Sequence, residues 1–241
     1  MNQNKNRYPV LALHGFLGQG QDWNPILLNH CCFRAPDLFT PGPLQLGHKF
    51  DEWISRLSQY DFVNERPWLV GYSMGGRLAA AAYLKYPEKY SGLVLVSANI
   101  EPLSKAERIQ RKNNDRQWAQ LMDQLSWQDW LNKWNGQSVF LGSRQPDRCF
   151  LPEQIPILQS ALKNFGLADQ PQVDWGLLAE YKSRVYFCVG EKDIKYRKIY
   201  QGLVNSQKIE NFQIISGAGH RVLLDQPEGL RRHLLELFKK H

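Results

Sequence analysis

The chain has 241 residues, of which 43% are hydrophobic and 22% are charged, and its formal net charge is +7. This length and composition predict a globular protein with one well-buried core, and no stretch approaches the roughly eighteen uninterrupted apolar residues of a membrane-spanning helix. The segment Met1–Arg7 leads into a strand too short for the apolar region of a signal peptide, so we expect a cytoplasmic protein that inserts into no membrane.

The positive charge is spread along the chain. The densest groups of Lys and Arg lie at 108–112, 231–232 and 239–240, and no nucleic-acid-binding motif accompanies them. A basic protein of this kind suits nucleic acid, a membrane surface or a small anionic ligand. The scattered distribution favours a solvated basic surface, and we expect no nucleic-acid partner. The sequence carries no signal for a particular oligomeric state.

Four cysteines occur, at Cys31, Cys32, Cys149 and Cys188. Their spacing matches neither a zinc site nor a disulfide framework, so we expect buried free thiols. The sequence has no metal-ligand cluster, no dinucleotide fingerprint and no phosphate-cradling loop. We therefore expect neither a metal nor a cofactor.

The first half of the chain alternates strands and helices. An apolar run at 8–13 predicts a buried strand, and His14 to Gly20 form a glycine-rich loop after it. A second strand is predicted at 31–35, followed by a Pro/Gly-rich loop and a helix at about 49–59 whose apolar residues recur at helical spacing. Alternation of this kind predicts a parallel sheet covered by helices.

The most informative stretch is Gly71-Tyr72-Ser73-Met74-Gly75. It follows an apolar strand at 67–70 and precedes an alanine-rich helix at 78–84 that ends before Pro87, and a further strand is predicted at 92–97. A Ser flanked by Gly two residues away on each side is the nucleophile-elbow pattern, in which a strained turn exposes the hydroxyl above the sheet. An ordinary glycine-rich turn is the alternative that this motif alone leaves open.

Between 99 and 174 the strand-like runs disappear. Ser104 and Glu107 fit a capping box that opens a helix, 127–134 suggests a second helix, 142–152 a loop, and 158–165 a third helical piece. We expect this segment to be a helical cap inserted into one core domain made of residues 1–98 and 175–241.

Strands return near the end of the chain. Residues 184–189 predict one strand and 212–215 another, and the chain finishes in a helix at about 229–239. Asp193 follows the first of these strands and His220 the second. In parallel sheets the carboxyl ends of the strands face the site, so both side chains are expected on the edge that carries Ser73.

Ser73, Asp193 and His220 occur in the order Ser, acid, His. A neutral imidazole takes the Ser proton when its other nitrogen donates to an oriented carboxylate, and we expect these three to form a catalytic triad. Asp225 and Glu191 are the alternative acids. His14 comes too early in the chain to be the base, so we expect it to support its loop.

These motifs resemble those of the α/β-hydrolase superfamily over nearly the whole length. The resemblance rests on His14-Gly15-Phe16, on the Ser73 elbow, on 190–193 and on 217–220. It implies an α/β-hydrolase fold, a mostly parallel sheet flanked by helices with a helical cap. It also implies an oxyanion hole made by the backbone N–H groups of Phe16 and Met74.

Further details are similar to the family of 2-succinyl-6-hydroxy-2,4-cyclohexadiene-1-carboxylate synthases, which act in menaquinone and phylloquinone biosynthesis. They are Arg77 after the elbow, the stretches 114–119 and 130–140, and 193–196. The resemblance implies a lyase in which the triad removes a ring proton and pyruvate leaves from the enolpyruvyl ether of 2-succinyl-5-enolpyruvyl-6-hydroxy-3-cyclohexene-1-carboxylate. The substrate is a small tricarboxylate. The substrate-binding residues implied are Tyr72, Arg77, Arg116, Trp134 and Lys195.

Three carboxylates require fixed cations with bidentate reach, which suits these basic side chains. Arg116 beside Asp115 is equally consistent with a salt bridge within the cap. The chain departs from the family at Asn135, where Tyr usually follows Trp, and the segment 144–172 lacks a match for a further cap arginine.

A serine carboxylesterase or C–C bond hydrolase would carry the same elbow and triad. A non-catalytic binding module on this scaffold is a further alternative, which need not keep the contacts between His220 and the other two residues.

Overall fold

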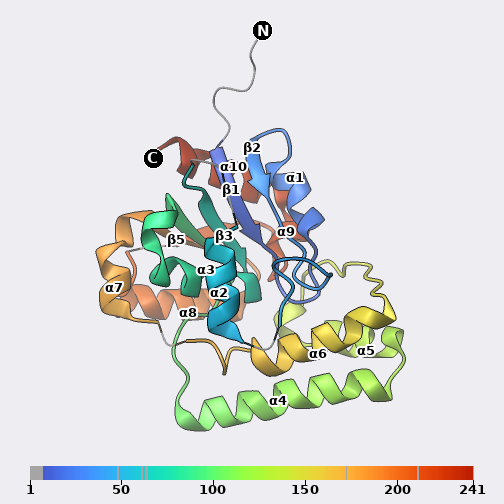
Figure 1. Ribbon diagram of the computed structural model, residues 1–241. Coiled ribbons are helices and arrows are strands. Elements are labelled where there is room, and N and C mark those ends of the chain that lie inside the picture. The colour runs from blue at the N-terminus through green and yellow to red at the C-terminus, as the bar shows by residue number, and fades with distance from the viewer. Residues whose placement is uncertain are drawn as a thin grey trace.

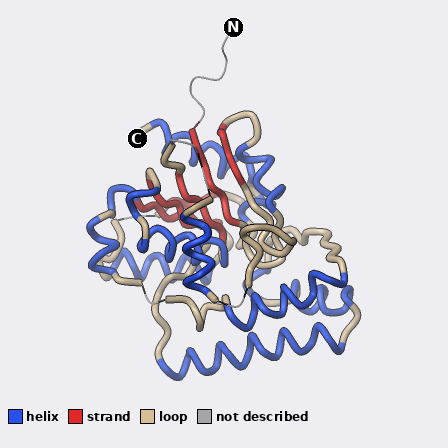
Figure 2. The backbone as a smooth tube through the Cα atoms, in the orientation of Figure 1, coloured by secondary structure: helices blue, strands red, loops and turns tan. Residues whose placement is uncertain are grey.

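Six short strands form one parallel sheet at the centre of the molecule, in the order β2-β1-β3-β4-β5-β6 (Figures 1 and 2). The computed structural model describes residues 8–47, 49–60, 62, 65–171, 173–210 and 212–240. The strands are β1 Tyr8–Leu13, β2 Cys31–Arg34, β3 Trp68–Tyr72, β4 Gly92–Val96, β5 Val185–Gly190 and β6 Gln213–Ile215. The expected parallel sheet is confirmed.

Helices connect the strands, as parallel pairing requires, because each connection must cross from one end of the sheet to the other. They are α1 Asn24–Leu27, α2 Phe50–Ser58, α3 Met74–Lys85, α4 Lys105–Gln124, α5 Trp127–Asn135, α6 Ile155–Asn164, α7 Trp175–Glu180, α8 Ile194–Asn205, α9 Val222–Asp225 and α10 Pro227–Lys239. The segment Met1–Arg7, on which the expected cytoplasmic location rests, lies outside the described residues, as do Gln172 and His241 of the expected domains.

Alternate side chains of the strands enter two separate cores. On β1, Val10 and Ala12 face a core that includes residues of α1, α9 and α10, whereas Leu11 and Leu13 face the core under α2, α3 and α8. This period of two is the pleat of a strand buried on both faces, which explains why the strand sequences are continuously apolar.

The chain between β4 and α7 forms α4, α5 and α6, which lie beneath the sheet in Figure 1, at the opposite end of the molecule from α10. The capping box predicted at the start of α4 is confirmed. The Ser104 hydroxyl accepts from the Glu107 N–H at 3.3 Å, and the Glu107 carboxylate accepts from the Ser104 N–H at 2.9 Å.

Several helices differ from the sequence expectation. Helix α3 begins at Met74, so its first turn includes Gly75 and Gly76, which have low helix propensity. Helices α7 and α8 had no counterpart in the sequence analysis. In α8 the buried Tyr196, Tyr200 and Leu203 recur at helical spacing, a pattern that the sequence analysis overlooked.

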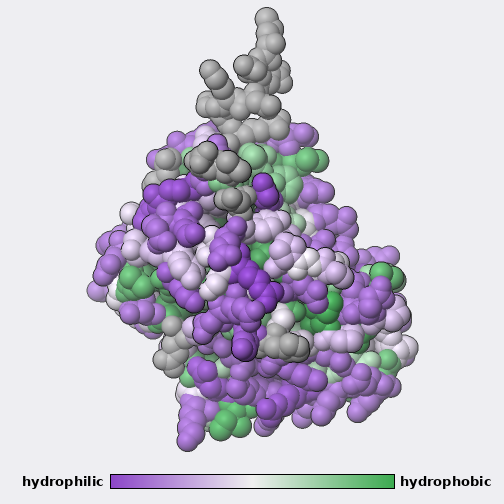
Figure 3. Space-filling model, viewed as in Figure 1, coloured by the Kyte–Doolittle hydropathy of each residue, from purple (hydrophilic) through white to green (hydrophobic). Residues whose placement is uncertain are grey.

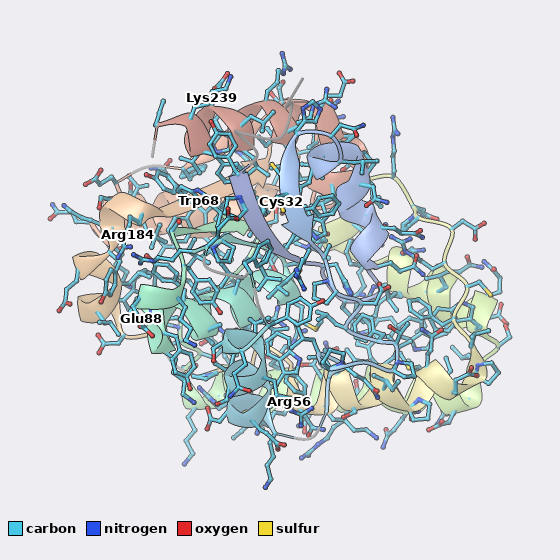
Figure 4. All side chains as sticks on the ribbon, turned by 45° about the horizontal axis from the view of Figure 1, so that its top comes forward. Cys32, Arg56, Trp68, Glu88, Arg184 and Lys239 are labelled. Atoms are coloured by element: carbon cyan, nitrogen blue, oxygen red, sulfur yellow. The ribbon has the colours of Figure 1, made fainter. Side chains whose placement is uncertain are left out.

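The expectation of four buried thiols is wrong for two of them. Cys31 and Cys188 are buried, whereas Cys149 lies exposed in a loop and Cys32 is exposed on the edge strand β2, where neighbours cover only one side (Figure 4). Hydrophilic residues cover most of the face shown in Figure 3. Among the described helices, none has the length and apolar character that crossing a membrane requires.

The close approach of α3 to β1 generates a stability prediction. A Cβ at Gly75 would lie 2.4 Å from the carbonyl oxygens of Leu13 and His14. We expect Gly75→Ala to lower the free energy of unfolding by about 2–3 kcal/mol, because rigid backbone must move. Urea unfolding measures this.

The matched control is Gly202→Ala in α8, where a Cβ meets nothing within 4 Å. This change should raise the free energy of unfolding by up to about 1 kcal/mol, since Ala favours the helix. Equal effects of the two substitutions would contradict the packing argument.

Candidate active site

Ser73 occupies a strained turn between β3 and α3. Its φ is +52°, a left-handed value that is costly for a residue with a Cβ, and its N–H donates to the Val96 carbonyl of the neighbouring strand at 2.9 Å. A Cβ at Gly71 would lie 2.4 Å from the Gly75 carbonyl oxygen, so the strand and helix nearly touch. This is the geometry that the G-x-S-x-G spacing predicts, with the Ser side chain presented above the sheet edge.

The imidazole of His220 joins Ser73 to Asp193. His220 Nε2 lies 3.2 Å from Ser73 Oγ, and His220 Nδ1 lies 2.7 Å from Asp193 Oδ2. Both His220 and Asp193 are buried, each with 3% of its surface exposed. With Nδ1–H donating to the carboxylate, Nε2 is free to accept the hydroxyl proton.

Three strand ends place these side chains together. Ser73 follows β3, Asp193 follows β5, and His220 follows β6, all at the carboxyl edge of the sheet. Asp193 also caps α8, because its Oδ1 accepts from the Tyr196 N–H at 3.3 Å. One carboxylate therefore orients both the imidazole and the first turn of a helix.

The two alternative acids have other partners. The Asp225 carboxylate accepts from the backbone N–H groups of Arg144 at 2.7 Å and Gly219 at 2.8 Å. The Glu191 carboxylate accepts from the Gly217 N–H at 2.8 Å on the surface. Both acids hold loops, and neither contacts the His220 ring through a hydrogen bond among the described residues.

His14 supports its loop, as the sequence predicts. The Leu38 N–H donates to His14 Nε2 at 3.0 Å, so the ring proton sits on Nδ1, which donates to the Gly15 carbonyl at 2.8 Å. Burial lowers the pKa of His14, although its hydrogen bond to Gly15 opposes this, and the ring remains neutral.

The loop that His14 supports lies against the elbow. A Cβ at Gly15 would lie 3.4 Å from the Ser73 Cβ, and both Phe16 and Met74 line the cavity that Ser73 lines. Met74 is the first residue of α3, so no carbonyl of its own helix can accept its N–H.

Ser73 and His220 line a cavity of about 230 Å³ between the sheet edge and the insertion. Tyr72, Trp134 and Lys195, all implied by the family resemblance, also line it. The Tyr72 ring lies 5.5 Å from the His220 ring, and the Trp134 ring lies 4.9 Å from the Phe16 ring. Lys195 is exposed at the rim, where partial burial and the charge of Arg111 lower its pKa.

Arg77 is a desolvated cation in this cavity. Its Nη2 donates to the Phe165 carbonyl at 3.2 Å, but its buried Nε has no hydrogen-bond partner, and no carboxylate of the described residues lies within ion-pair distance. Burial lowers the pKa of Arg77 to about 10, so it stays charged at neutral pH. An unpaired buried guanidinium is suited to binding an anion.

Arg116 does not line the cavity, and this corrects its assignment as a substrate-binding residue. Its side chain is exposed on the outer face of α4. The alternative, a salt bridge between Arg116 and Asp115, is not formed either, because Asp115 accepts from Arg111 Nε at 2.8 Å. Arg111 lies on the inner face of α4 and lines the cavity instead.

The sequence analysis missed four residues of the site. Arg111 carried a signal, since it lies four residues before the buried Asp115 on the same helix face. Tyr196 follows the acid loop, and its ring lies 4.7 Å from the His220 ring. Arg148 and Arg221 also line the cavity, but both come from irregular segments that no periodicity identifies.

A family model for the alpha/beta hydrolase family matches residues 10–233. The chain belongs to the α/β-hydrolase family. This membership agrees with the sheet order, the elbow and the expected fold class.

Within this α/β-hydrolase family, the chain is similar to proteins named 2-succinyl-6-hydroxy-2,4-cyclohexadiene-1-carboxylate synthase. The one from Escherichia coli O1:K1 / APEC is 29% identical over 95% of this chain and 93% of that protein. The one from Salmonella arizonae is 26% identical over the same shares. The structure of MenH from S. aureus has a TM-score of 0.81 and 22% identity, covering 98% of this chain and 96% of that one, which supports the fold.

Neutral, buried His14 generates a pH prediction. Its pKa is lowered in the folded protein relative to the ordinary value of 6.5, so the stability it contributes is present above that value and is lost as the pH falls below it. Between about pH 7 and about pH 5 the free energy of unfolding should fall, and in His14→Gln the fall should be smaller by about 1 kcal/mol. His30→Gln, at an exposed position, should keep the wild-type fall. An unchanged pH dependence in His14→Gln would contradict the assignment.

Proposed function

We propose that the protein is a carbon–oxygen lyase that converts 2-succinyl-5-enolpyruvyl-6-hydroxy-3-cyclohexene-1-carboxylate into 2-succinyl-6-hydroxy-2,4-cyclohexadiene-1-carboxylate and pyruvate, a step of menaquinone or phylloquinone biosynthesis. The observation that carries the proposal is a Ser-His-Asp hydrogen-bond chain that opens into a cavity rich in cations. The synthases at 26% and 29% identity, matched over nearly their full length, support the same reaction.

The triad is proposed to act as a base. His220 Nε2 takes the Ser73 proton, and the Ser73 oxygen removes the proton from ring carbon 2, which the neighbouring succinyl carbonyl acidifies. A new double bond forms between carbons 2 and 3, the existing one moves to carbons 4 and 5, and the bond from carbon 5 to the ether oxygen breaks. Pyruvate leaves as its enolate and recovers the proton, so no water is consumed.

The negative charge that develops on the succinyl carbonyl oxygen requires donors. We assign this role to the N–H groups of Phe16 and Met74, which border the Ser73 side of the cavity. Gly75 lets the early loop approach α3 so closely that the two amides can face one oxygen. The triad and these amides together supply the base and the electrostatic stabilisation that an elimination needs.

Binding of the tricarboxylate is assigned to the cavity cations, with Arg77, Arg111 and Lys195 as its first group. Helix α4 of segment 99–174 supplies Arg111, so we propose that this segment is a cap that completes the substrate site. Tyr72 and Trp134 provide the remaining walls. A site of this charge favours small anions over the neutral esters that a carboxylesterase takes.

A serine carboxylesterase is the second candidate, because a Ser at the strained elbow with a hydrogen-bonded His is also an activated nucleophile. Pyruvate release from the enolpyruvyl substrate separates the two functions. We expect Ser73→Ala to lower that rate by at least about 300-fold, while aryl ester turnover and inactivation by organophosphorus reagents are slow in the wild-type protein. Ser91→Ala is the matched control, because Ser91 precedes β4 at the end of the sheet that lies away from the triad. Fast ester turnover without pyruvate release would refute the lyase.

Helix α4 offers a matched pair of arginines, because Arg111 lines the cavity and Arg116 does not. Arg111→Gln should raise KM for pyruvate release by about 10–100-fold, because a charge-assisted contact to a carboxylate is lost. Arg116→Gln removes the same charge from the exposed face of α4 and should leave KM within about twofold. The thermal midpoint of each variant shows whether the unpaired Asp115 destabilises the fold, and a larger effect at Arg116 would contradict the structure.

A further inference from the structure

Five cations of the described residues line the cavity, and they fall into two groups. After the larger effect of burial, Arg111 lowers the pKa of both Arg77 and Lys195, so Arg111 lies near each of them. Burial lowers the pKa of Arg221, Tyr72 and Asp225 raise it, and Arg148 lowers it by a smaller amount, so Arg148 lies near Arg221. The substrate class proposed above carries three carboxylates, so a single cationic group leaves part of its charge without a partner.

Arg221 is held in place by neutral groups only. Its Nη1 donates to the Arg144 carbonyl at 3.1 Å and its Nη2 to Asn135 Oδ1 at 2.5 Å. The guanidinium carbon lies 4.0 Å from the centre of the Phe140 ring, and 6% of the residue is exposed. The guanidinium is therefore fixed in orientation but keeps its full positive charge.

Asp22 and Asp225 form their hydrogen bonds with groups other than the Arg221 guanidinium. Arg148 Nη2 donates to both oxygens of Asp22 at 2.6 Å, so that pair is neutral overall. The Asp225 carboxylate raises the pKa of Arg221 through its charge, but its hydrogen bonds go to backbone N–H groups of Arg144 and Gly219 and none is formed with the guanidinium. Among the described residues, Arg221 is thus the cation of the second group that has no carboxylate partner, and it lines the cavity beside Tyr72.

Asn135 connects this arrangement to the departure of the sequence from its family, in which Tyr usually follows Trp at this point. Asn135 is 7% exposed, and its side-chain oxygen accepts from Arg221 at the cavity wall next to Trp134. An amide oxygen accepts two hydrogen bonds and carries no charge, so it orients the guanidinium without neutralising it.

We propose that Arg221, oriented by Asn135 and Phe140, is a second carboxylate-binding residue that selects ligands whose two carboxylates are far enough apart to reach both Arg77 and Arg221. The choice of substrate class rests on the proposed function, but the binding site itself does not. The alternative is that Arg221 only links the loop after β6 to the insertion, through its bonds to residues 135 and 144.

Binding of a stable dicarboxylate tests the site without catalysis. The probe is 4-(2-carboxyphenyl)-4-oxobutanoate, whose aromatic ring cannot undergo elimination, together with its two monomethyl esters, titrated by isothermal calorimetry. In the wild-type protein each esterification should weaken binding by about tenfold. In Arg221→Gln, one of the two monomethyl esters should bind less than about twofold more weakly than the diacid, while the other should still bind about tenfold more weakly. In Arg77→Gln, the ester that was affected in Arg221→Gln should be the unaffected one, and the reverse.

Arg144→Gln is the matched control, because it removes one exposed charge from the segment whose backbone carbonyl holds Arg221, and it should keep the wild-type pattern. Arg221→Lys should keep a reduced discrimination of about threefold, because the charge remains and the planar fork is lost. Equal weakening of the diacid and both esters in Arg221→Gln, as a structural link predicts, would overturn the proposal, as would no binding of the diacid to the wild-type protein. Discrimination between the esters without pyruvate release would overturn the lyase and leave the second site standing.

Discussion

The contact between the start of α3 and the end of β1 positions everything else in the site. Gly75 has no side chain, so the helix approaches the Leu13 and His14 carbonyls more closely than a Cβ allows. This contact accompanies the left-handed turn at Ser73 and places the loop after β1 against the elbow, so that Phe16 and Met74 line the same cavity. His14 stabilises the other side of the contact through two hydrogen bonds to backbone groups. The close packing at Gly75 is thus a condition for the geometry of the triad.

Charged side chains are distributed unevenly between the surface and the cavity. Most ionisable side chains lie on the surface, where pairs such as Glu52 with Arg56 contribute little to stability. In the cavity, by contrast, Asp22 is the one acidic residue among the described lining residues, against five cations. Arg111 and Arg148 pair with Asp115 and Asp22, whereas Arg77 and Arg221 have no carboxylate of the described residues within ion-pair distance. Burying such unpaired cations costs free energy. A ligand with carboxylates would recover part of this cost, which agrees with the proposed substrate class.

Much of the fold could be predicted from the sequence, because strands buried on both faces are continuously apolar and their exits carry Ser73, Asp193 and His220. Which cations of segment 99–174 face the cavity could not be predicted from the sequence. Arg111 and Arg116 lie on one helix, and which of them faces the cavity depends on the packing of α4 against α6 rather than on any motif. Arg148 and Arg221 lie in irregular segments that tertiary contacts alone orient. Helix α8 was missed although its apolar residues recur at helical spacing and Asp193 caps its first turn.

The insertion leaves the sheet after β4, and β4 is the strand between β3 and β5 that contributes no member of the Ser-His-Asp chain. Part of the cavity wall, including Arg111, Trp134 and Arg148, is consequently encoded apart from the reacting groups. Arg77, Lys195 and Arg221 instead lie close in sequence to Ser73, Asp193 and His220. A change in the stretch after β4 therefore alters one wall of the cavity and leaves the strand ends that carry the reacting groups in place. Divergence of ligand preference on a conserved reaction centre is the evolutionary route that this connectivity opens.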